Sequence, residues 1–271
     1  MFATSAAEQA PRLEFPAPSP LATVKQRVGL TDIEIVYSRP GAKDRKVFGG
    51  LVPYGQVWRT GANASTKISF STDVKLNGAP VPAGKYALYT IPGEKEWTVI
   101  IYKDTNLGNA ANYQQSNDVA RVKVKPAKLA EFVETFTIDI NDLRDDSATI
   151  NLVWEKTHVP VNLTMDVATT LVPQIETAMA ATEGRKPYYQ AAMFYYDHGK
   201  DLNQALKWVD AAIAEREQFY MVHLKAKILA KLGDKKGAVE AAKRSSELAV
   251  KAEGPTSGYV KLNDDLIGKL R

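Results

Sequence analysis

The sequence predicts an α+β protein in which an antiparallel β-sandwich or barrel-like N-terminal domain is followed by a C-terminal helical-repeat bundle. Between residues 21 and 166, apolar and polar residues alternate with a period of two, which is typical of half-buried strands. After Asp166 the apolar residues recur every four positions, which is the spacing of one helical face. This change of period divides the chain into an extended arm (1–20), a β domain (21–166) and a helical domain (167–271).

The first twenty residues are rich in alanine and proline. Pro16, Pro18 and Pro20 fall within five residues, and proline fits neither a helix interior nor a central strand. We therefore expect an extended arm here. The small residues at positions 3–7 are also what would follow a removed signal sequence in a periplasmic or secreted protein. The alternative is an ordinary frayed start of a cytoplasmic protein.

Turn residues separate the short strands of the β domain. Asn77 and Gly78 tolerate the positive φ of a type I′ turn and predict a tight hairpin. Pro92 and Gly93 mark a second turn. Roughly eight to ten short strands of this kind are typical of an antiparallel sandwich or barrel. The clearest runs are 33–37, 67–71, 74–76, 86–91, 97–102, 122–124, 132–140, 149–154 and 159–165.

The helical domain contains an internal repeat. Ala192 and Ala226 are 34 residues apart, as are Gly199 and Gly233, and this period resembles that of tetratricopeptide repeats. Two repeats are fewer than the roughly three needed for independent stability, so we expect them to lean on the β domain or on a helix over 167–183. We also expect the small residues at helix crossings to be buried. These are Ala192, Ala205, Ala226 and Ala238.

Composition excludes several classes of function. The chain has no cysteine, which rules out disulfides, thiolate nucleophiles and cysteine metal sites. Residues 167–271 carry 16 Lys and Arg against 13 Asp and Glu, which is not the basic excess of a nucleic-acid-binding protein. No apolar run approaches the roughly 18–20 residues of a membrane span. No cofactor motif is present, and the three histidines lack the spacing of metal ligands, so we predict neither a cofactor nor a metal.

Seven segments of the β domain occur together in a distinctive order. They are Tyr37-Ser-Arg-Pro-Gly41, Phe48-Gly-Gly-Leu-Val-Pro-Tyr-Gly55, Val57-Trp-Arg-Thr-Gly-Ala-Asn63, Pro82-Ala-Gly-Lys-Tyr86, Ile91-Pro-Gly93, Asn117-Asp-Val-Ala-Arg-Val-Lys-Val124 and Val153-Trp-Glu-Lys156. This set resembles the domain-of-unknown-function family numbered 2911 over about residues 20–166. The resemblance implies a bacterial protein that is usually exported, and it brings no established activity or ligand.

The stretches 38–45 and 58–63, together with Tyr54 between them, supply the candidate ligand-binding site of the β domain. Arginine offers forked donors to an anion, a tryptophan or tyrosine offers a stacking face, and glycine allows close approach of the backbone. An anionic or sugar-like ligand would fit. In the structural alternative, the arginines pair with carbonyls or with carboxylates such as Asp44 and Glu134, and the tryptophan fills the core. The candidate residues are Arg39, Arg45, Tyr54, Trp58, Arg59 and Asn63.

The helical domain supplies a second candidate site. If its helices pair as in tetratricopeptide repeats, the first helix of each pair lines a groove that combines aromatic residues with lysines. Such a groove suits an extended peptide with an acidic end; the alternative is that this face packs on the β domain. The candidate residues are Tyr189, Met193, Tyr196, His223, Lys227 and Lys231.

The favoured interpretation is a non-enzymatic binding or interaction module of the bacterial envelope, whose partner is a protein or peptide held by the helical repeats. The alternative is an enzyme or a small-anion- or sugar-binding protein that uses the arginine, tryptophan and asparagine loops of the β domain.

Overall fold

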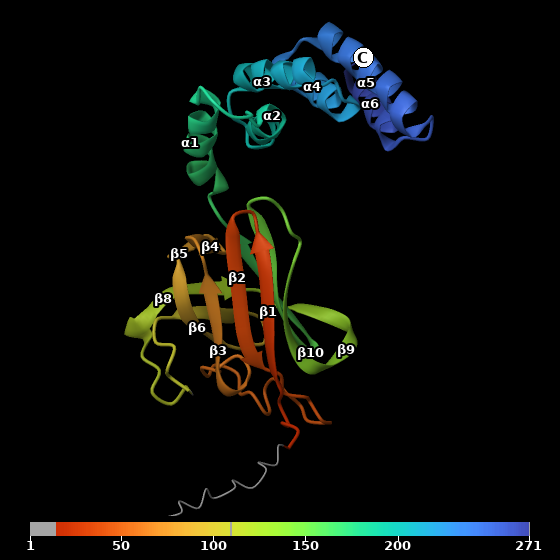
Figure 1. Ribbon diagram of the computed structural model, residues 1–271. Coiled ribbons are helices and arrows are strands. Elements are labelled where there is room, and N and C mark those ends of the chain that lie inside the picture. The colour runs from red at the N-terminus through yellow and green to blue at the C-terminus, as the bar shows by residue number, and fades with distance from the viewer. Residues whose placement is uncertain (1–14, 109, 271) are drawn as a thin grey trace, which may run out of the picture. The chain divides into compact units, whose positions relative to one another are not determined.

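The computed structural model describes residues 15–108 and 110–270 (Figure 1). The chain forms two compact units, which divide between Val167 and Ala168. Residues 1–14 of the expected arm lie outside the described residues, and residues 15–20 form neither helix nor strand. Each unit is described by itself.

The larger sheet of the first unit has six antiparallel strands in the order β1-β2-β3-β6-β7-β8. Every residue of β7 is buried, which indicates that both faces of the sheet are covered at this strand. The strands are β1 (Leu21–Val28), β2 (Thr31–Ser38), β3 (Ala62–Phe70), β6 (Gly84–Ile91), β7 (Trp97–Tyr102) and β8 (Asp118–Val124).

The smaller sheet has four antiparallel strands in the order β5-β4-β10-β9. The predicted hairpin joins β4 to β5, and Asn77 and Gly78 have φ values of 43° and 86°, as the turn requires. Neither sheet closes on itself within the described residues, so the unit holds two open sheets and no closed barrel. The strands are β4 (Val74–Leu76), β5 (Ala79–Val81), β9 (Ala127–Asn141) and β10 (Ser147–Thr164).

The strands predicted over 149–154 and 159–165 are one strand, β10. The polar residues between the two runs suggest a turn, but Thr157 and His158 pair with Lys128 and Ala127 of β9. The change of register is absorbed at Glu155, which has a φ of 51°. Irregularities of this kind bend a strand without ending it, so the separate strands were a wrong prediction.

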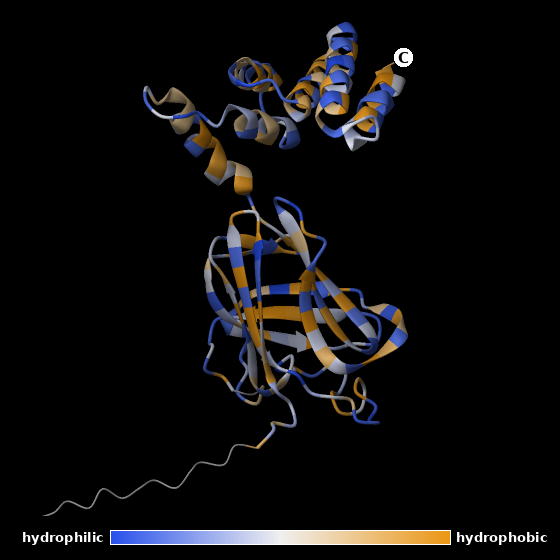
Figure 2. Cartoon of the chain, turned by 45° about the vertical axis from the view of Figure 1, so that its right-hand side comes forward, coloured by the Kyte–Doolittle hydropathy of each residue, from blue (hydrophilic) through white to orange (hydrophobic). Residues whose placement is uncertain are grey.

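Aromatic side chains from both sheets meet in one core. Trp97 lies on β7, Trp154 on β10 and Phe136 on β9, while Phe48 and Trp58 come from the segment between β2 and β3. The ring centroids of Phe48 and Trp97 are 4.9 Å apart, and those of Trp58 and Phe136 are 5.1 Å apart. Edge-to-face pairs of this kind contribute about 0.5–1.5 kcal/mol each beyond the area that they bury. Figure 2 shows the alternation of apolar and polar residues along the strands.

The second unit contains six helices among the described residues (Figure 1). Asp201 and Asp234 accept hydrogen bonds from the first backbone amides of α3 and α5, and Gly233 ends α4 with a φ of 88°, which an L-residue adopts only with strain. The helices are α1 (Val167–Ala180), α2 (Tyr188–Asp197), α3 (Leu202–Glu215), α4 (Phe219–Leu232), α5 (Lys235–Glu253) and α6 (Gly258–Leu270).

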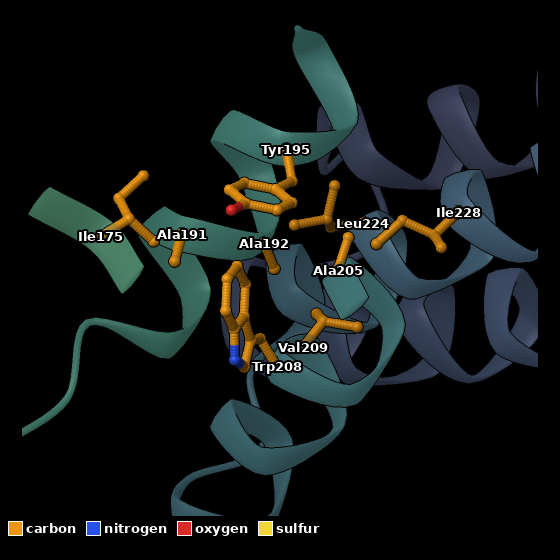
Figure 3. Close-up of a cluster of buried hydrophobic side chains, with 9 residues drawn as sticks. All are labelled: Ile175, Ala191, Ala192, Tyr195, Ala205, Trp208, Val209, Leu224 and Ile228. Carbon is orange, nitrogen blue, oxygen red and sulfur yellow. The ribbon is translucent and has the colours of Figure 1, made fainter. Parts of the chain in front are cut away.

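The alanines predicted at helix crossings are fully buried, which confirms that expectation. Ala192 and Ala205 lie in one apolar cluster, and Ala226 and Ala238 lie in the next. Figure 3 shows the first cluster, in which Ile175 of α1 packs together with residues of α2, α3 and α4. Helix α1 therefore covers apolar surface that the helix pairs alone would leave exposed.

Candidate functional site

Two of the three predicted arginines of the first unit, Arg39 and Arg45, use their donors within the chain. Arg39 follows β2, and its Nε donates to the carbonyl of Phe136 at 3.1 Å, while its Nη2 donates to Thr137 Oγ1 at 2.7 Å. Arg45 donates to the carbonyls of Ala42 and Gly41, at 2.9 and 2.8 Å. Arg39 thus joins the end of β2 to β9, and Arg45 closes its own loop.

The acceptors of these arginines are backbone and hydroxyl oxygens, where the structural alternative also considered carboxylates. Glu134 is occupied otherwise, because its Oε1 accepts a hydrogen bond from the backbone amide of Lys43 at 2.8 Å. Lys43 and Asp44 have φ values of 51° and 60°. A loop of this shape leaves carbonyls without a strand partner, and an arginine fork satisfies them.

Trp58 belongs to the aromatic core. Its ring is stacked on Trp154 at a centroid distance of 5.9 Å and meets Phe48, Trp97 and Phe136 edge-on. Its indole Nε1 donates to the carbonyl of Gly61 at 3.1 Å. A ring surrounded in this way is engaged by the fold, so the geometry favours the structural interpretation of Trp58.

Arg59 and Asn63 form a local pair at the start of β3. Arg59 Nη1 donates to the carbonyl of Asn63 at 2.5 Å. Asn63 has a φ of 59°, and its Nδ2 donates to Ser38 Oγ and to the carbonyl of Ser19, both at 3.3 Å. These contacts tie the segment before β1 to the ends of β2 and β3, and the Arg59 side chain keeps donors that have no partner in the described residues.

Tyr54 lies at a cavity that none of the other five predicted site residues lines. The cavity has a volume of about 220 Å³, and Tyr54 lines it together with Phe48, Trp97, Lys128 and Lys156. Burial, and then the carboxylates of Glu94 and Glu155, raise the pKa of Tyr54, so its hydroxyl stays protonated at neutral pH. The six predicted residues therefore do not form one site.

A group of tyrosines on the six-stranded sheet was not predicted. The Tyr113 hydroxyl donates to both oxygens of Asp118, at 2.6 and 2.7 Å, and accepts from Arg121 Nη1 at 2.9 Å. Burial, and then Asp118, raise the pKa of Tyr113. The rings of Tyr89 and Tyr102 pack beside it. The absence of polar alternation over residues 97–102 was the signal that something covers this face.

The second unit presents cations beside aromatic rings on α2, α4 and α6. The ammonium groups of Lys227 and Lys231 lie 4.4 and 4.0 Å from the centroid of the Tyr196 ring. Lys231 Nζ also donates to the carbonyl of Tyr196 at 3.2 Å. Burial, and then Asp197, raise the pKa of Tyr196. The structure therefore brings three of the six predicted residues of this site into direct contact.

His223 of α4 is held by α6 through a buried polar network. Asn263 is fully buried, and its Nδ2 donates to Ser245 Oγ at 3.0 Å, which turns its Oδ1 toward His223. The imidazole Nδ1–H donates to that oxygen at 2.6 Å. Burial, and then the charge of Lys227, lower the pKa of His223, while the hydrogen bond to Asn263 opposes them.

The other two predicted residues of this site lie on α2. The ring of Tyr189 meets that of Tyr220 on α4 at a centroid distance of 5.1 Å. Met193 is 39% exposed. We call the residues on these three helices the cationic–aromatic surface. They are Tyr189, Met193, Tyr196, Tyr220, His223, Lys227, Lys231 and Tyr259.

The described parts of the chain contain neither a metal-binding cluster nor a membrane-spanning helix. Within 15–108 and 110–270, no three histidine or acidic side chains are grouped closely enough to hold a metal ion. No helix in those same segments combines the length and the apolar character needed to cross a bilayer.

Two open antiparallel sheets followed by six helices define a two-unit α+β chain that carries candidate binding surfaces. The chain belongs to the family described as Protein of unknown function (DUF2911), whose model matches residues 19–163, just over half of the sequence. The match ends before α1, so it does not extend to the helices. No curated protein and no solved structure matches the chain.

Proposed function

We propose that this protein is a non-enzymatic binding module, and that its cationic–aromatic surface binds an extended peptide carrying acidic groups. The observation that carries this proposal is the pair of ammonium groups at the Tyr196 ring. Two like charges close together repel each other, and one ring quadrupole offsets this repulsion only in part. A carboxylate between them would remove it.

Asp197 acts on Tyr196, but it pairs with neither lysine within the described residues. Helix α4 has no acidic residue, and neither Lys227 nor Lys231 makes an ion pair within the described residues. Lys225, on another side of the same helix, is paired with Asp210 at 2.8 Å. The chain therefore neutralises the lysine that faces α3 and leaves the two beside Tyr196 available for a ligand.

We also propose that the two sheets form a sandwich and that the helices form tetratricopeptide-like repeats. A sandwich arrangement of the two sheets is supported by the aromatic core to which both contribute. A tetratricopeptide-like arrangement is supported by the 34-residue spacing of buried Ala192 and Ala226 and by the packing of α2 against α3 and of α4 against α5. In that arrangement α2, α4 and α6 are the first helices of successive repeats.

We also propose a location in the bacterial envelope. The chain belongs to a family whose members we expect to be exported bacterial proteins, and this supports the proposal. Fractionation of a bacterium that carries the gene tests it: the protein is expected in the periplasmic or secreted fraction. Recovery in the cytoplasmic fraction alone would overturn this part and leave the binding proposal in place.

The binding test uses the full chain and a fluorescein-labelled peptide rich in glutamate, with fluorescence anisotropy as the readout. Wild type is expected to bind it, and added salt is expected to weaken the complex. Changing both lysines in Lys227→Gln/Lys231→Gln should weaken binding about tenfold or more, because hydrogen bonds to charged groups contribute about 1.5–3 kcal/mol.

A matched control is Lys235→Gln/Lys236→Gln, which removes the same charge from exposed positions at the start of α5. This variant should bind the peptide as wild type does. If both double variants lose affinity equally, the attraction is a property of net charge and the proposed surface is wrong. Absence of binding to wild type at low salt would also reject it.

A second candidate function is supported by the cavity beside Tyr54. Lys128 and Lys156 line it, and neither is in an ion pair within the described residues. A small acidic sugar or inorganic anion would suit this combination of cations and aromatic edges. Thermal melts with phosphate, sulfate and glucuronate test it: a stabilisation that disappears in Lys128→Gln/Lys156→Gln supports the site, and no shift in wild type rejects it.

A further inference from the structure

We propose that a cleft between the start of α2, the end of α3 and the start of α4 is a second anion-binding site, so that the peptide carries acidic groups at two separated positions. This inference rests on the proposed function, because it concerns the other end of the same surface.

The cleft has a volume of about 430 Å³ and three cations in its lining. Arg185 and Lys186 precede α2, and Arg216 follows α3. Arg185 and Arg216 are exposed, and Lys186 is half-buried. The one carboxylate in the lining is that of Glu215. The cleft therefore has a net positive charge before any ligand is present.

These cations have no ionic partner in the parts of the chain that the structure describes. That sets them apart from Arg244 of α5, which donates to Glu217 at 2.7 Å and is also within 3.3 Å of Glu247. Unpaired guanidinium groups beside tyrosine hydroxyls offer several donors to one carboxylate. The tyrosines that line the cleft are Tyr188, Tyr189 and Tyr220.

An aromatic strip connects this cleft to the lysines. Tyr189 and Tyr220 line the cleft and contact each other, and Tyr220 contacts Phe219 at 5.5 Å. Phe219 meets Tyr259 of α6 at 4.8 Å, and Tyr259 meets His223. His223 lies one helical turn before Lys227 on α4, so we take the cleft and the Tyr196 site as the two ends of one surface.

The length of the strip follows from helix geometry. Tyr189 at the cleft and Tyr196 beneath the lysines are seven positions apart on α2, which places them on the same face about 10 Å apart along the axis. An extended peptide advances about 3.3 Å per residue. Acidic groups with two or three neutral residues between them lie about 10–13 Å apart and would therefore reach both ends, with the intervening residues on the strip.

The spacing favours a peptide over a nucleic acid. A nucleic acid strand places a phosphate at every nucleotide, so it would also set charge over the middle of the strip. The residues there are the aromatic side chains of Phe219, Tyr220 and Tyr259, and none is a lysine or arginine. A peptide can leave that stretch uncharged.

The test compares three labelled peptides on the full chain by fluorescence anisotropy. The first has two glutamates at each end, separated by three neutral residues. The second has glutamates at one end and glutamines at the other, and the third has glutamines at both ends. The first is expected to bind about tenfold more tightly than the second, since linking two contacts raises the effective concentration of the second contact. The third should not bind measurably.

The variant Arg185→Gln/Arg216→Gln should reduce the affinity of the first peptide to that of the second. Both arginines are exposed, so its melting temperature should equal that of wild type. Lys235→Gln/Lys236→Gln again serves as the matched control and should leave all three affinities unchanged.

Different failures have different meanings. Equal binding of the first two peptides, or an unchanged affinity in Arg185→Gln/Arg216→Gln while Lys227→Gln/Lys231→Gln loses binding, overturns the second site and leaves the proposed function intact. No effect of Lys227→Gln/Lys231→Gln on any peptide overturns the proposed function itself, and with it this inference.

Discussion

Both units of the chain place basic side chains beside aromatic rings. In the β unit they lie within residues 38–63, which we call the signature loops, and in the helical unit they form the cationic–aromatic surface. The two regions differ in which groups accept hydrogen bonds from the basic side chains. In the loops, Arg39 and Arg45 donate to oxygens of the chain, and Trp58 is surrounded by core rings. On the helices, Lys227 and Lys231 share one ring and make no ion pair within the described residues. The comparison teaches that a distinctive motif can specify the fold, while the surface that we propose for binding lies where charges are left without an ion pair.

This difference predicts that substitutions in the loops change stability and that substitutions on the helical surface change binding.

The largest loss is expected for Trp58→Ala. It removes a ring that contacts four others and leaves a cavity between the sheets, which should lower the free energy of unfolding by about 3–5 kcal/mol. Urea denaturation of the full chain measures this. Tyr54→Ala, at an aromatic position that is 38% exposed, is the control and should cost much less. Equal losses in the two variants would show that Trp58 is not part of the core.

Arg39→Ala should be the next most damaging change. It removes two hydrogen bonds that join β2 to β9, for an expected loss of about 2–3 kcal/mol. Arg59→Ala removes one bond within a single exposed segment and should cost less than about 1 kcal/mol. The ratio of the two losses is the informative quantity. A larger loss for Arg59→Ala would contradict the assignment of Arg39 as the link between the sheets.

Ala226→Leu tests the helix crossings. The side chain is fully buried among other alanines, so three added carbons should overpack the contact and cost about 1–3 kcal/mol. Ala252→Leu, at an exposed position near the end of α5, should stay within about 0.5 kcal/mol of wild type. An unchanged denaturation midpoint for Ala226→Leu would mean that α4 and α5 do not cross at this residue.

The smallest effect is a dependence of stability on pH. Because the pKa of His223 is lowered in the folded chain, the unfolded chain binds this proton more readily. The contribution of His223 is therefore present above the usual pKa of about 6.5 and declines as the pH falls below it. The melting temperature between about pH 7.5 and about pH 5 should fall more steeply in wild type than in His223→Gln. Parallel curves would remove His223 as a source of the dependence.

Much of the fold could be predicted from the sequence. The period-two runs, the Asn77-Gly78 turn and the 34-residue spacing of Ala192 and Ala226 are local signals, and the corresponding elements are present. Strand β10 was divided in two because a bulge and a turn look alike when the pairing strand is unknown.

The candidate sites were harder to predict, because the local sequence around a side chain does not show which groups will accept its hydrogen bonds in the fold. Arg39 reaches Thr137, which is 98 positions away, and Tyr54 lies apart from the arginines that are near it in sequence. The helical site was predicted from a simple periodicity, and the structure brings Tyr196, Lys227 and Lys231 of that prediction into contact. Arg185 and Arg216 of the proposed cleft were not predicted, because they lie outside the helices on which the repeat was identified.

The most direct test of the contrast between the two regions is to locate the bound peptide. Backbone amide spectra of the isotope-labelled full chain, recorded with and without the peptide that is acidic at both ends, report the affected residues. We expect changes confined to α2, α4, α6 and the segments that line the cleft, with residues 38–63 unchanged. Changes centred on residues 38–63, with the helices unaffected, would show that the signature loops are the binding site and would contradict this account.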